Sequence, residues 1–378
     1  MATVAGGAVD AGWAERNLGL DYRAELGVRV AAPPDGPALR REIIEYDSES
    51  PTGAAFLARA SAAPGGLSRF VPISWPKGLA PQPGKRPRGD SLPNADVLVV
   101  TWTVDEGHAL SRVLTPGLDS HDDWMPYTKN FAPLSKLMQP DAPAVQSGRL
   151  GSYWTTVIGQ REVTLFKSDS HMSQDGPKLA NALVWKQIIE DTQPKLVITT
   201  GTGGAIDPSL QVGDVVVSRF VSFDCQRSFK RYNGDSYAAS ADPPSSMFAT
   251  ACSLFAANAG FLPNDNSRPP QIVTATAPNS GILTTDFFCI ATTDNHYDLQ
   301  GKSNLVEMGD AVLGMVCQQL GPTAPDWCIV RNVSNPEISS QGLPIDQQAT
   351  LSADIYKAYG GWSSVCSSIV CWAIISAQ

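Results

Sequence analysis

Short apolar runs alternate with amphipathic segments from residue 96 onward. Residues 96–103, DVLVVTWT, form a continuous apolar run rich in valine, and residues 195–200, KLVITT, form a second one. Runs of this length without polar alternation predict strands that are buried on both faces of a parallel sheet. Residues 212–223 and 327–335 are predicted as further strands on the same grounds.

Helical spacing appears between these runs. Residues 177–194 place Leu179, Leu183, Val184 and Ile188 on one helical face and end at a proline. Residues 303–321 are predicted as a second helix that closes on a glycine, and the apolar residues 363–377 as a packed C-terminal helix, too short for a membrane span.

This alternation of strands and helices predicts an α/β fold with three layers, α/β/α, around a mixed, largely parallel central sheet.

The stretch LVITTGTGGAID, residues 196–207, predicts a glycine-rich turn at the carboxyl end of a strand, where open α/β sheets bind ligands. A dinucleotide fingerprint is excluded because Ile206 holds the place of its third glycine. A phosphate-binding P-loop is excluded because no lysine follows before Lys230. The loop therefore serves another kind of ligand.

Residues 1–95 differ from the rest in their proline and glycine content. We predict an N-terminal extension there, with an exposed Pro/Gly-rich linker at residues 75–94, followed by one domain at residues 96–378.

Composition limits the kinds of partner and the cellular setting that are expected for this protein. A formal net charge of −9 argues against nucleic acid as a partner and favours a small molecule. Seven cysteines without a C-x-x-C pair indicate a reducing, cytoplasmic setting, and the N-terminus has no secretory pattern. No membrane association and no cofactor are expected. The segment HDDW, residues 121–124, lacks the spacing of a metal site and is expected to be a solvated loop.

Five segments in order resemble the nucleoside phosphorylase and nucleosidase superfamily, closest to its methylthioadenosine/S-adenosylhomocysteine nucleosidases. They are VLVVTWTVDEGHAL, LVITTGTGGAIDPSLQVGDVVVS, TTDFFCIA, LVEMGDAVLGMVC and CIVRNVSN. The resemblance covers roughly residues 95–375 and agrees with the predicted fold.

The resemblance implies a site. Glu106 stands at the place of the glutamate that activates water, although a plain carboxylate at a strand end has the same pattern. Phe288 stands where a ring stacks on the base, although a core aromatic is the alternative. Asn335 falls at the catalytic acid. The remaining implied contacts to the substrate are Thr202, Gly203, Gly204, Cys289, Met308, Asp310 and Ser334.

Two positions depart from the pattern of the superfamily. Its ribose-binding glutamate falls at Gly309, and Asp310 next to it points about 100° away around a helix. Either the backbone shifts, or the ligand lacks an ordinary ribose diol. Asn335 can donate a hydrogen bond but cannot protonate a purine, as an aspartic acid does.

Two other residues, His171 and Asp286, lie within the part of the chain that this resemblance covers. His171 occupies a loop where members of the superfamily have a small glycine-rich turn, and contact with a ligand and an exposed position are both open. Asp286 is expected to pin its own segment.

These observations leave three functions open. The first is hydrolysis of the N-glycosidic bond of a purine nucleoside or sugar-modified derivative. The others are a non-catalytic nucleoside- or purine-binding relative and a biosynthetic enzyme with a repurposed pocket. Water is favoured over phosphate because Thr199 replaces one phosphate-binding arginine of the phosphorylases and no arginine lies in residues 97–111. The resemblance also implies a homo-oligomer, dimer or hexamer.

Overall fold

The fold is built on four adjacent parallel strands. The computed structural model describes residues 72–378 except residues 88, 90, 241 and 264–265. Strands β5 (Arg161–Ser168), β2 (Val97–Thr101), β6 (Leu196–Ala205) and β13 (Asp326–Asn335) lie side by side in this order, all parallel. Every residue of β2 is buried, as its unbroken apolar sequence predicts.

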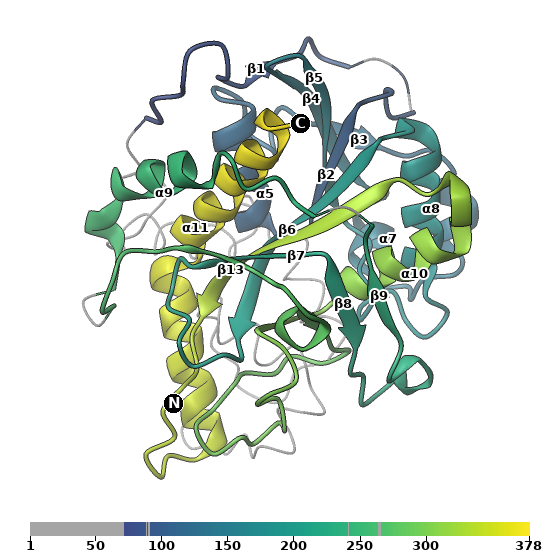
Figure 1. Cartoon of the computed structure of the whole chain (residues 1–378). Helices are drawn as coiled ribbons and strands as arrows, with labels where there is room; N and C mark the ends of the chain where they lie inside the picture. Colours follow the sequence, from purple (N-terminus) through teal and green to yellow (C-terminus); the bar gives the residue numbers. More distant parts are fainter. Residues whose placement is uncertain (1–71, 88, 90, 241, 264–265) are drawn as a thin grey trace, which may run out of the picture.

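Further strands extend this core into one mixed sheet, which has 13 strands within the described part of the chain (Figure 1). They are β1 (Gln82–Pro83), β3 (Met125–Tyr127), β4 (Gly151–Ile158), β7 (Val215–Ser218), β8 (Phe220–Phe223), β9 (Ser236–Ala238), β10 (Ile272–Thr274), β11 (Ile282–Thr284) and β12 (Leu305–Glu307). β4 pairs antiparallel with β5 on one side, and β12 pairs antiparallel with the end of β6 on the other.

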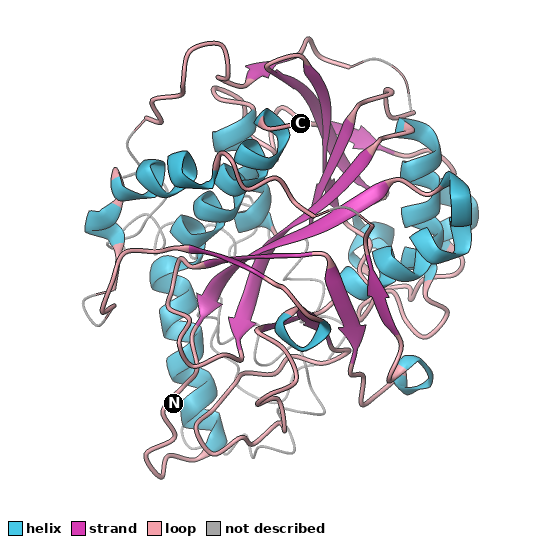
Figure 2. Ribbon diagram, viewed as in Figure 1, coloured by secondary structure: helices cyan, strands magenta, loops and turns pink. Residues whose placement is uncertain are grey.

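Helices cover both faces of the sheet, which gives the predicted three layers (Figure 2). One face is covered by α5 (Val104–Leu114), α9 (Phe248–Ala256) and α11 (Ile345–Ser376). The other is covered by α6 (Phe131–Ser135), α7 (Pro143–Ser147), α8 (Ala180–Thr192) and α10 (Asp310–Leu320). The three-layer α/β fold class predicted from the sequence is confirmed.

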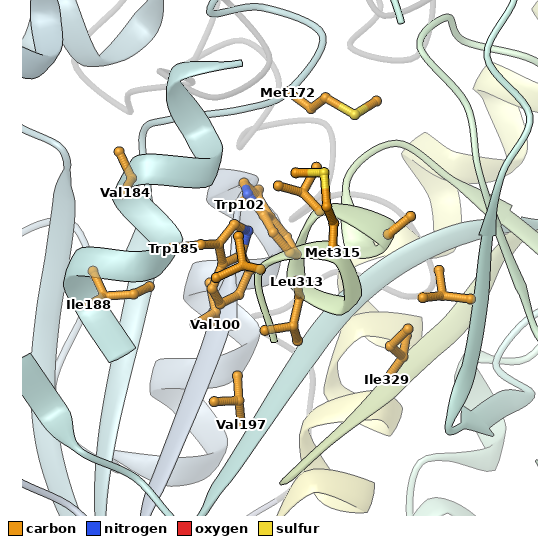
Figure 3. Packing of buried hydrophobic residues seen from close by; sticks show 14 of the residues in the cluster. Val100, Trp102, Met172, Val184, Trp185, Ile188, Val197, Leu313, Met315 and Ile329 are labelled. Atoms are coloured by element: carbon orange, nitrogen blue, oxygen red, sulfur yellow. The ribbon is translucent and has the colours of Figure 1, made fainter. Parts of the chain in front are cut away.

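A large apolar cluster fills the space between the sheet and α8 and α10. Trp102, at the end of β2, packs edge-on against Trp185 of α8 with ring centroids 6.0 Å apart (Figure 3). Leu313 and Met315 of α10 belong to the same cluster, and Figure 3 shows them beside the two tryptophans. This packing holds the carboxyl end of β2 against α10.

The C-terminal helix α11 packs along the opposite face, against α5, β13 and β6. Its portion Ala358–Ser376 is long and apolar enough to cross a membrane by length and composition alone. However, 83% of that window is buried inside the protein, which is the environment of a core helix. The predicted packed C-terminal helix is confirmed and is longer than expected.

Four details of the sequence prediction are wrong. The glycines of residues 201–204 continue strand β6 instead of forming a turn, because β12 and β13 both pair with them. Residues 305–307 form strand β12 ahead of α10, because Leu305 and Val306 pair with β6 and β11. The predicted strand 212–223 is two strands, β7 and β8.

The fourth detail concerns the apolar face predicted around α8. Leu183 is exposed, and Leu179 precedes the helix in a left-handed conformation with φ of 52°.

The proline-rich segment that was expected to be an exposed linker is packed onto the domain. β1 pairs with β4, and Trp75 lies against Trp372 of α11 with ring centroids 4.7 Å apart. The indole N–H groups of Trp154 and Trp372 donate to the carbonyls of Gly84 and Leu79. Trp75 and Leu79 are partly buried against the apolar cluster under α11, so this segment packs on the domain while many of its other residues are exposed. Residues 1–71 of the predicted extension lie outside the described residues.

Candidate functional site

The carboxylate of Glu106 is buried at the carboxyl end of β2. It lies in the first turn of α5 and forms a capping box with Thr103, the residue that caps the helix. Its Oε2 accepts hydrogen bonds from the Thr101 hydroxyl at 2.9 Å and from the backbone N–H groups of Trp102 and Thr103 at 3.0 and 2.9 Å. Its Oε1 accepts from both the N–H and the hydroxyl of Thr202, each at 2.8 Å. The carboxylate therefore ties β2 to β6.

Burial acts to raise the pKa of Glu106, but other interactions outweigh it. The charge of Arg331 and the backbone N–H groups of Thr202, Thr103 and Trp102 favour the ionised form and hold the pKa below its ordinary value. The alternative of a solvated carboxylate at this position is wrong, because the side chain is 3% exposed. Glu106 is a fixed negative charge inside the protein.

The glycines of β6 allow this arrangement. A Cβ atom on Gly201 would lie 2.5 Å from Oε1 of Glu106 and 2.7 Å from Nη1 of Arg331, and its φ is 153°. A Cβ on Gly203 would lie 2.0 Å from Cδ2 of Leu305. Gly201 is thus required for the close approach of two charged side chains, and Gly203 for the approach of β12. The N–H and hydroxyl of Thr202 donate to Glu106 rather than standing ready for a ligand.

Arg331 of β13 is the buried cation of this region. Its Nε and Nη2 donate to the two oxygens of Asp310 at 2.8 and 2.7 Å, a bidentate pair. Nη2 also reaches Glu307 at 3.3 Å, and Nη1 donates to the Thr202 carbonyl at 3.2 Å. The guanidinium carbon lies 4.9 Å from the centre of the Trp102 ring. Arg331 thus joins β13, β6, β12 and α10.

Glu307 closes the N-terminal end of α10. Its two oxygens accept from the backbone N–H groups of Gly309 and Asp310. The Thr284 hydroxyl also donates to it. Burial, followed by the negative charge of Asp310, raises its pKa to about 8.

Asn335 lies at the end of β13 and is also fully engaged. Its Nδ2 donates to the carbonyl and to the hydroxyl oxygen of Ser352 in α11, both at 2.9 Å, and its Oδ1 accepts from the Ser334 hydroxyl at 2.7 Å. Asn335 pairs with Gly204 in the sheet, and Ser334 also lies 3.3 Å from the carbonyl of Gly203. In this arrangement its amide is directed at α11.

The aromatic segment predicted to contact a base lies beside the same strand end. A Cβ on Gly204 would lie 3.9 Å from the Cys289 carbonyl. Phe288 and Met308 are partly buried against one apolar cluster that also contains Cys289 and Val306. Their segments therefore reach the end of β6 from β11 and β12.

His171 is buried in the same region, so the alternative of an exposed position is wrong. Its ring lies edge-on to Trp102 at 6.3 Å between centroids, and a Cβ on Gly309 would lie 3.8 Å from its Nε2. Burial, followed by the positive charge of Arg331, lowers its pKa to about 4. The imidazole is therefore neutral at pH 7.

Other predictions concern residues outside this region. Asp286 pins its segment as expected, because it accepts backbone N–H groups of Gln226, Arg227 and Phe229. Within the described residues, no group of three or more His, Cys, Asp or Glu side chains is arranged to hold a metal ion. His121 instead contacts its neighbour Asp122 at 2.7 Å.

The structure thus places Glu106 directly after β2 and Asn335 at the end of β13, with the glycines of β6 between them. Phe288, Cys289, Met308 and Asp310 come from the segments that follow β11 and β12. Sequence reasoning missed the two residues that link them, Arg331 and Glu307. A charged residue inside each of the apolar segments CIVRNV and NLVEM was the available signal, since an isolated buried charge requires a partner.

These carboxylates lie at the carboxyl ends of parallel strands, where open α/β sheets commonly bind ligands. Comparison with known proteins specifies the family. The family model described as "Phosphorylase superfamily" matches residues 125–353, more than half of the chain. The chain belongs to this superfamily.

Solved structures with a similar fold include nucleosidases. The 5′-methylthioadenosine/S-adenosylhomocysteine nucleosidase of Neisseria meningitidis, in complex with methylthio-immucillin-A, is 15% identical, and the match covers 75% of this chain and 99% of that chain with a TM-score of 0.46. Futalosine hydrolase of Helicobacter pylori is 14% identical over 74% of this chain and 96% of that chain, with a TM-score of 0.44. At these identities the likeness concerns the fold.

Proposed function

We propose that this chain binds a purine nucleoside or a sugar-modified derivative at the carboxyl ends of β2, β6 and β13 and hydrolyses its N-glycosidic bond. The observation that carries the proposal is an excess of buried negative charge. Glu106 and Asp310 are two carboxylates around one guanidinium, that of Arg331, and the carboxyl group of Glu307 lies against the same guanidinium. These groups carry at least one more negative than positive charge.

This excess suits the chemistry of glycosidic cleavage. The sugar becomes positively charged as the bond to the base breaks, and fixed negative charge near it stabilises that transition state more than the ground state. In the proposal the Thr202 hydroxyl turns away from Glu106, so that Oε1 of Glu106 can orient the attacking water. Phe288 stacks on the base, and Asn335 donates to the base after turning away from α11.

The same excess disfavours phosphate as the nucleophile. Among the lysines and arginines whose burial the structure describes, Lys167 and Arg331 are buried, and both are paired with carboxylates. A phosphate dianion needs guanidinium or ammonium groups that are free to contact it. Water is therefore the proposed nucleophile.

The test uses Glu106→Gln, with turnover measured per folded molecule well below the unfolding temperature. Loss of a positioned general base lowers turnover about 10²–10⁴-fold while ligand affinity changes little. Glu162→Gln, which alters an exposed glutamate of β5, is the matched control. Equal turnover in both variants would remove Glu106 from the mechanism.

A second function is favoured by one observation, the engagement of Asn335. Both of its amide hydrogens are donated to Ser352, which leaves none for a base. This arrangement suits a relative that binds a nucleoside or purine without cleaving it. Wild-type protein that binds such ligands but releases no base would establish this function. Under either proposal, we also propose that the protein is a homo-oligomer, either a dimer or a hexamer, and that it is located in the cytoplasm.

A further inference from the structure

The buried acceptors of the candidate site are already occupied by the protein. The oxygens of Glu106 accept from β2 and β6, those of Asp310 accept from Arg331, and those of Glu307 accept from α10, Thr284 and Arg331. A ligand that enters with hydroxyl groups therefore finds few oxygens free to accept its protons. Which ligand groups the site can bind therefore depends on the hydrogen-bond donors that the protein itself does not use.

His171 supplies such a donor. The backbone N–H of Ser173 points at its Nδ1 at 3.4 Å, and the Ser173 hydroxyl lies 2.9 Å from the same atom. Because a backbone N–H can only donate, Nδ1 is the acceptor, and the proton of the neutral ring lies on Nε2. Within the described residues, the hydrogen bonds of His171 lie at Nδ1 and at its backbone, and the residue is 9% exposed.

The loop that carries His171 is built to hold it in place. Asp175 accepts the N–H of His171 at 3.2 Å and the hydroxyl of Ser170 at 2.5 Å. Asn181 of α8 donates to the carbonyl of Ser170 at 3.0 Å. Residues 168–175 are all buried. This network, together with the edge contact to Trp102, fixes the direction of the ring.

Nε2 is directed at Gly309. A Cβ there would have only ordinary contacts, 3.8 Å to Nε2, 3.9 Å to Glu307 and 3.9 Å to Trp102, and φ of −168° is open to any residue. The glycine is therefore not required by the backbone. Asp310 does not replace a side chain at this place, because it is bound to Arg331. The region beside Gly309 thus presents the N–H donor of His171, while the nearby Oε2 of Glu307 already accepts from the N–H of Gly309 and from Arg331.

We infer that the group a ligand places beside Gly309 is a hydrogen-bond acceptor that receives the Nε2–H of His171, and that the ligand is a nucleoside whose sugar edge is blocked as an ether or a carbonyl instead of carrying a free diol. This inference rests on the proposed function, since it assumes that a nucleoside occupies the site. It selects the second of the two explanations for Gly309, a ligand without an ordinary ribose diol.

The test compares inosine with its 2′-O-methyl and 3′-O-methyl ethers by isothermal titration calorimetry. Wild-type protein is expected to bind at least one ether about tenfold more tightly than inosine, because the free diol leaves two O–H groups unpaired in a buried site. His171→Phe keeps a ring against Trp102 but removes the donor, and is expected to abolish the preference. His171→Gln returns an N–H at similar reach and is expected to restore it.

The variant Gly309→Glu adds a hydrogen-bond acceptor beside the sugar, whereas His171→Phe removes a donor. A carboxylate beside the sugar accepts both hydroxyl protons, so this variant is expected to prefer inosine over the ethers, whereas Gly309→Ala controls for loss of the glycine. Equal or tighter binding of inosine by the wild type would overturn the inference.

Base release, measured on the same samples, separates this result from the proposed hydrolysis. Ether preference without base release supports the inference and contradicts hydrolysis. Base release together with tighter binding of inosine than of the ethers supports hydrolysis and contradicts the inference. Absence of binding to all three compounds contradicts both.

Discussion

Replacement of Glu106 by glutamine directly tests the hydrogen bonds by which this carboxylate links β2 to β6. We call this set of hydrogen bonds the clamp. The carboxylate accepts five hydrogen bonds, three of them from backbone N–H groups that cannot reverse direction. An amide has one oxygen, so its NH₂ group must face either Thr202 or the pair Trp102 and Thr103. If it faces Thr202, the hydroxyl can rotate to accept, but the N–H is left unpaired.

The size of the effect follows from these bonds. One unpaired buried N–H costs about 1–3 kcal/mol, and the remaining bonds lose the added strength of a charged acceptor, about 1 kcal/mol or more in total. The expected loss of unfolding free energy is therefore roughly 2–4 kcal/mol, out of about 5–15 kcal/mol for a typical domain. With a urea m-value of about 3 kcal/mol/M, the unfolding midpoint falls by about 1 M.

Urea unfolding followed by tryptophan fluorescence measures this shift, and Glu162→Gln is the control with an exposed carboxylate. A midpoint for Glu106→Gln within 0.2 M (about 0.6 kcal/mol) of that control would refute the clamp. The same titration, carried out at the assay temperature, shows whether the variant is folded when its turnover is measured.

Three further variants extend the account. Burial, followed by the charge of Glu106, raises the pKa of Asp105 from 3.8 to about 7, so the folded state keeps a proton that the unfolded chain loses, and stability falls as pH rises from 4 to 7. Asp105→Asn lacks this loss and is expected to gain up to roughly 4 kcal/mol relative to wild type between pH 4 and pH 8 in urea titrations; a gap independent of pH would contradict the assignment. Gly201→Ala is expected to yield unfolded or strongly destabilised protein in a thermal melt, whereas Gly260→Ala, which has open space for a Cβ, is expected to melt like wild type; equal melting of the two would contradict the close approach of charges at β6. Arg331→Leu leaves Asp310 unpaired and is expected to cost about 3–5 kcal/mol in urea unfolding, and a loss below 1 kcal/mol would contradict the buried pair.

The layers of the fold could be predicted from the sequence because buried parallel strands require apolar runs, as in β2. The glycine stretch was misassigned as a turn. Glycine is ordinarily unfavourable inside a strand, and only the close approach of Glu106, Arg331 and Leu305 explains its presence in β6. Those neighbours come from distant parts of the chain.

The candidate site was predictable in position but not in detail. The order of the five segments placed Glu106, Thr202 and Asn335 at the ends of neighbouring strands. The sequence could not show that their hydrogen bonds are directed at one another and at α11, because side-chain direction is decided by the packing of α5 and α11 against the sheet. The neutral, buried state of His171 likewise depends on a loop network that no short motif encodes.

The central claim is hydrolysis of an N-glycosidic bond, and release of free base measures it most directly. Wild-type protein is incubated with a panel of purine nucleosides and their sugar-modified derivatives, with and without phosphate, and base and sugar products are separated by chromatography. We expect release of free base and free sugar at a rate that added phosphate leaves unchanged. Absence of base from every nucleoside, or formation of sugar 1-phosphate only when phosphate is present, would contradict it.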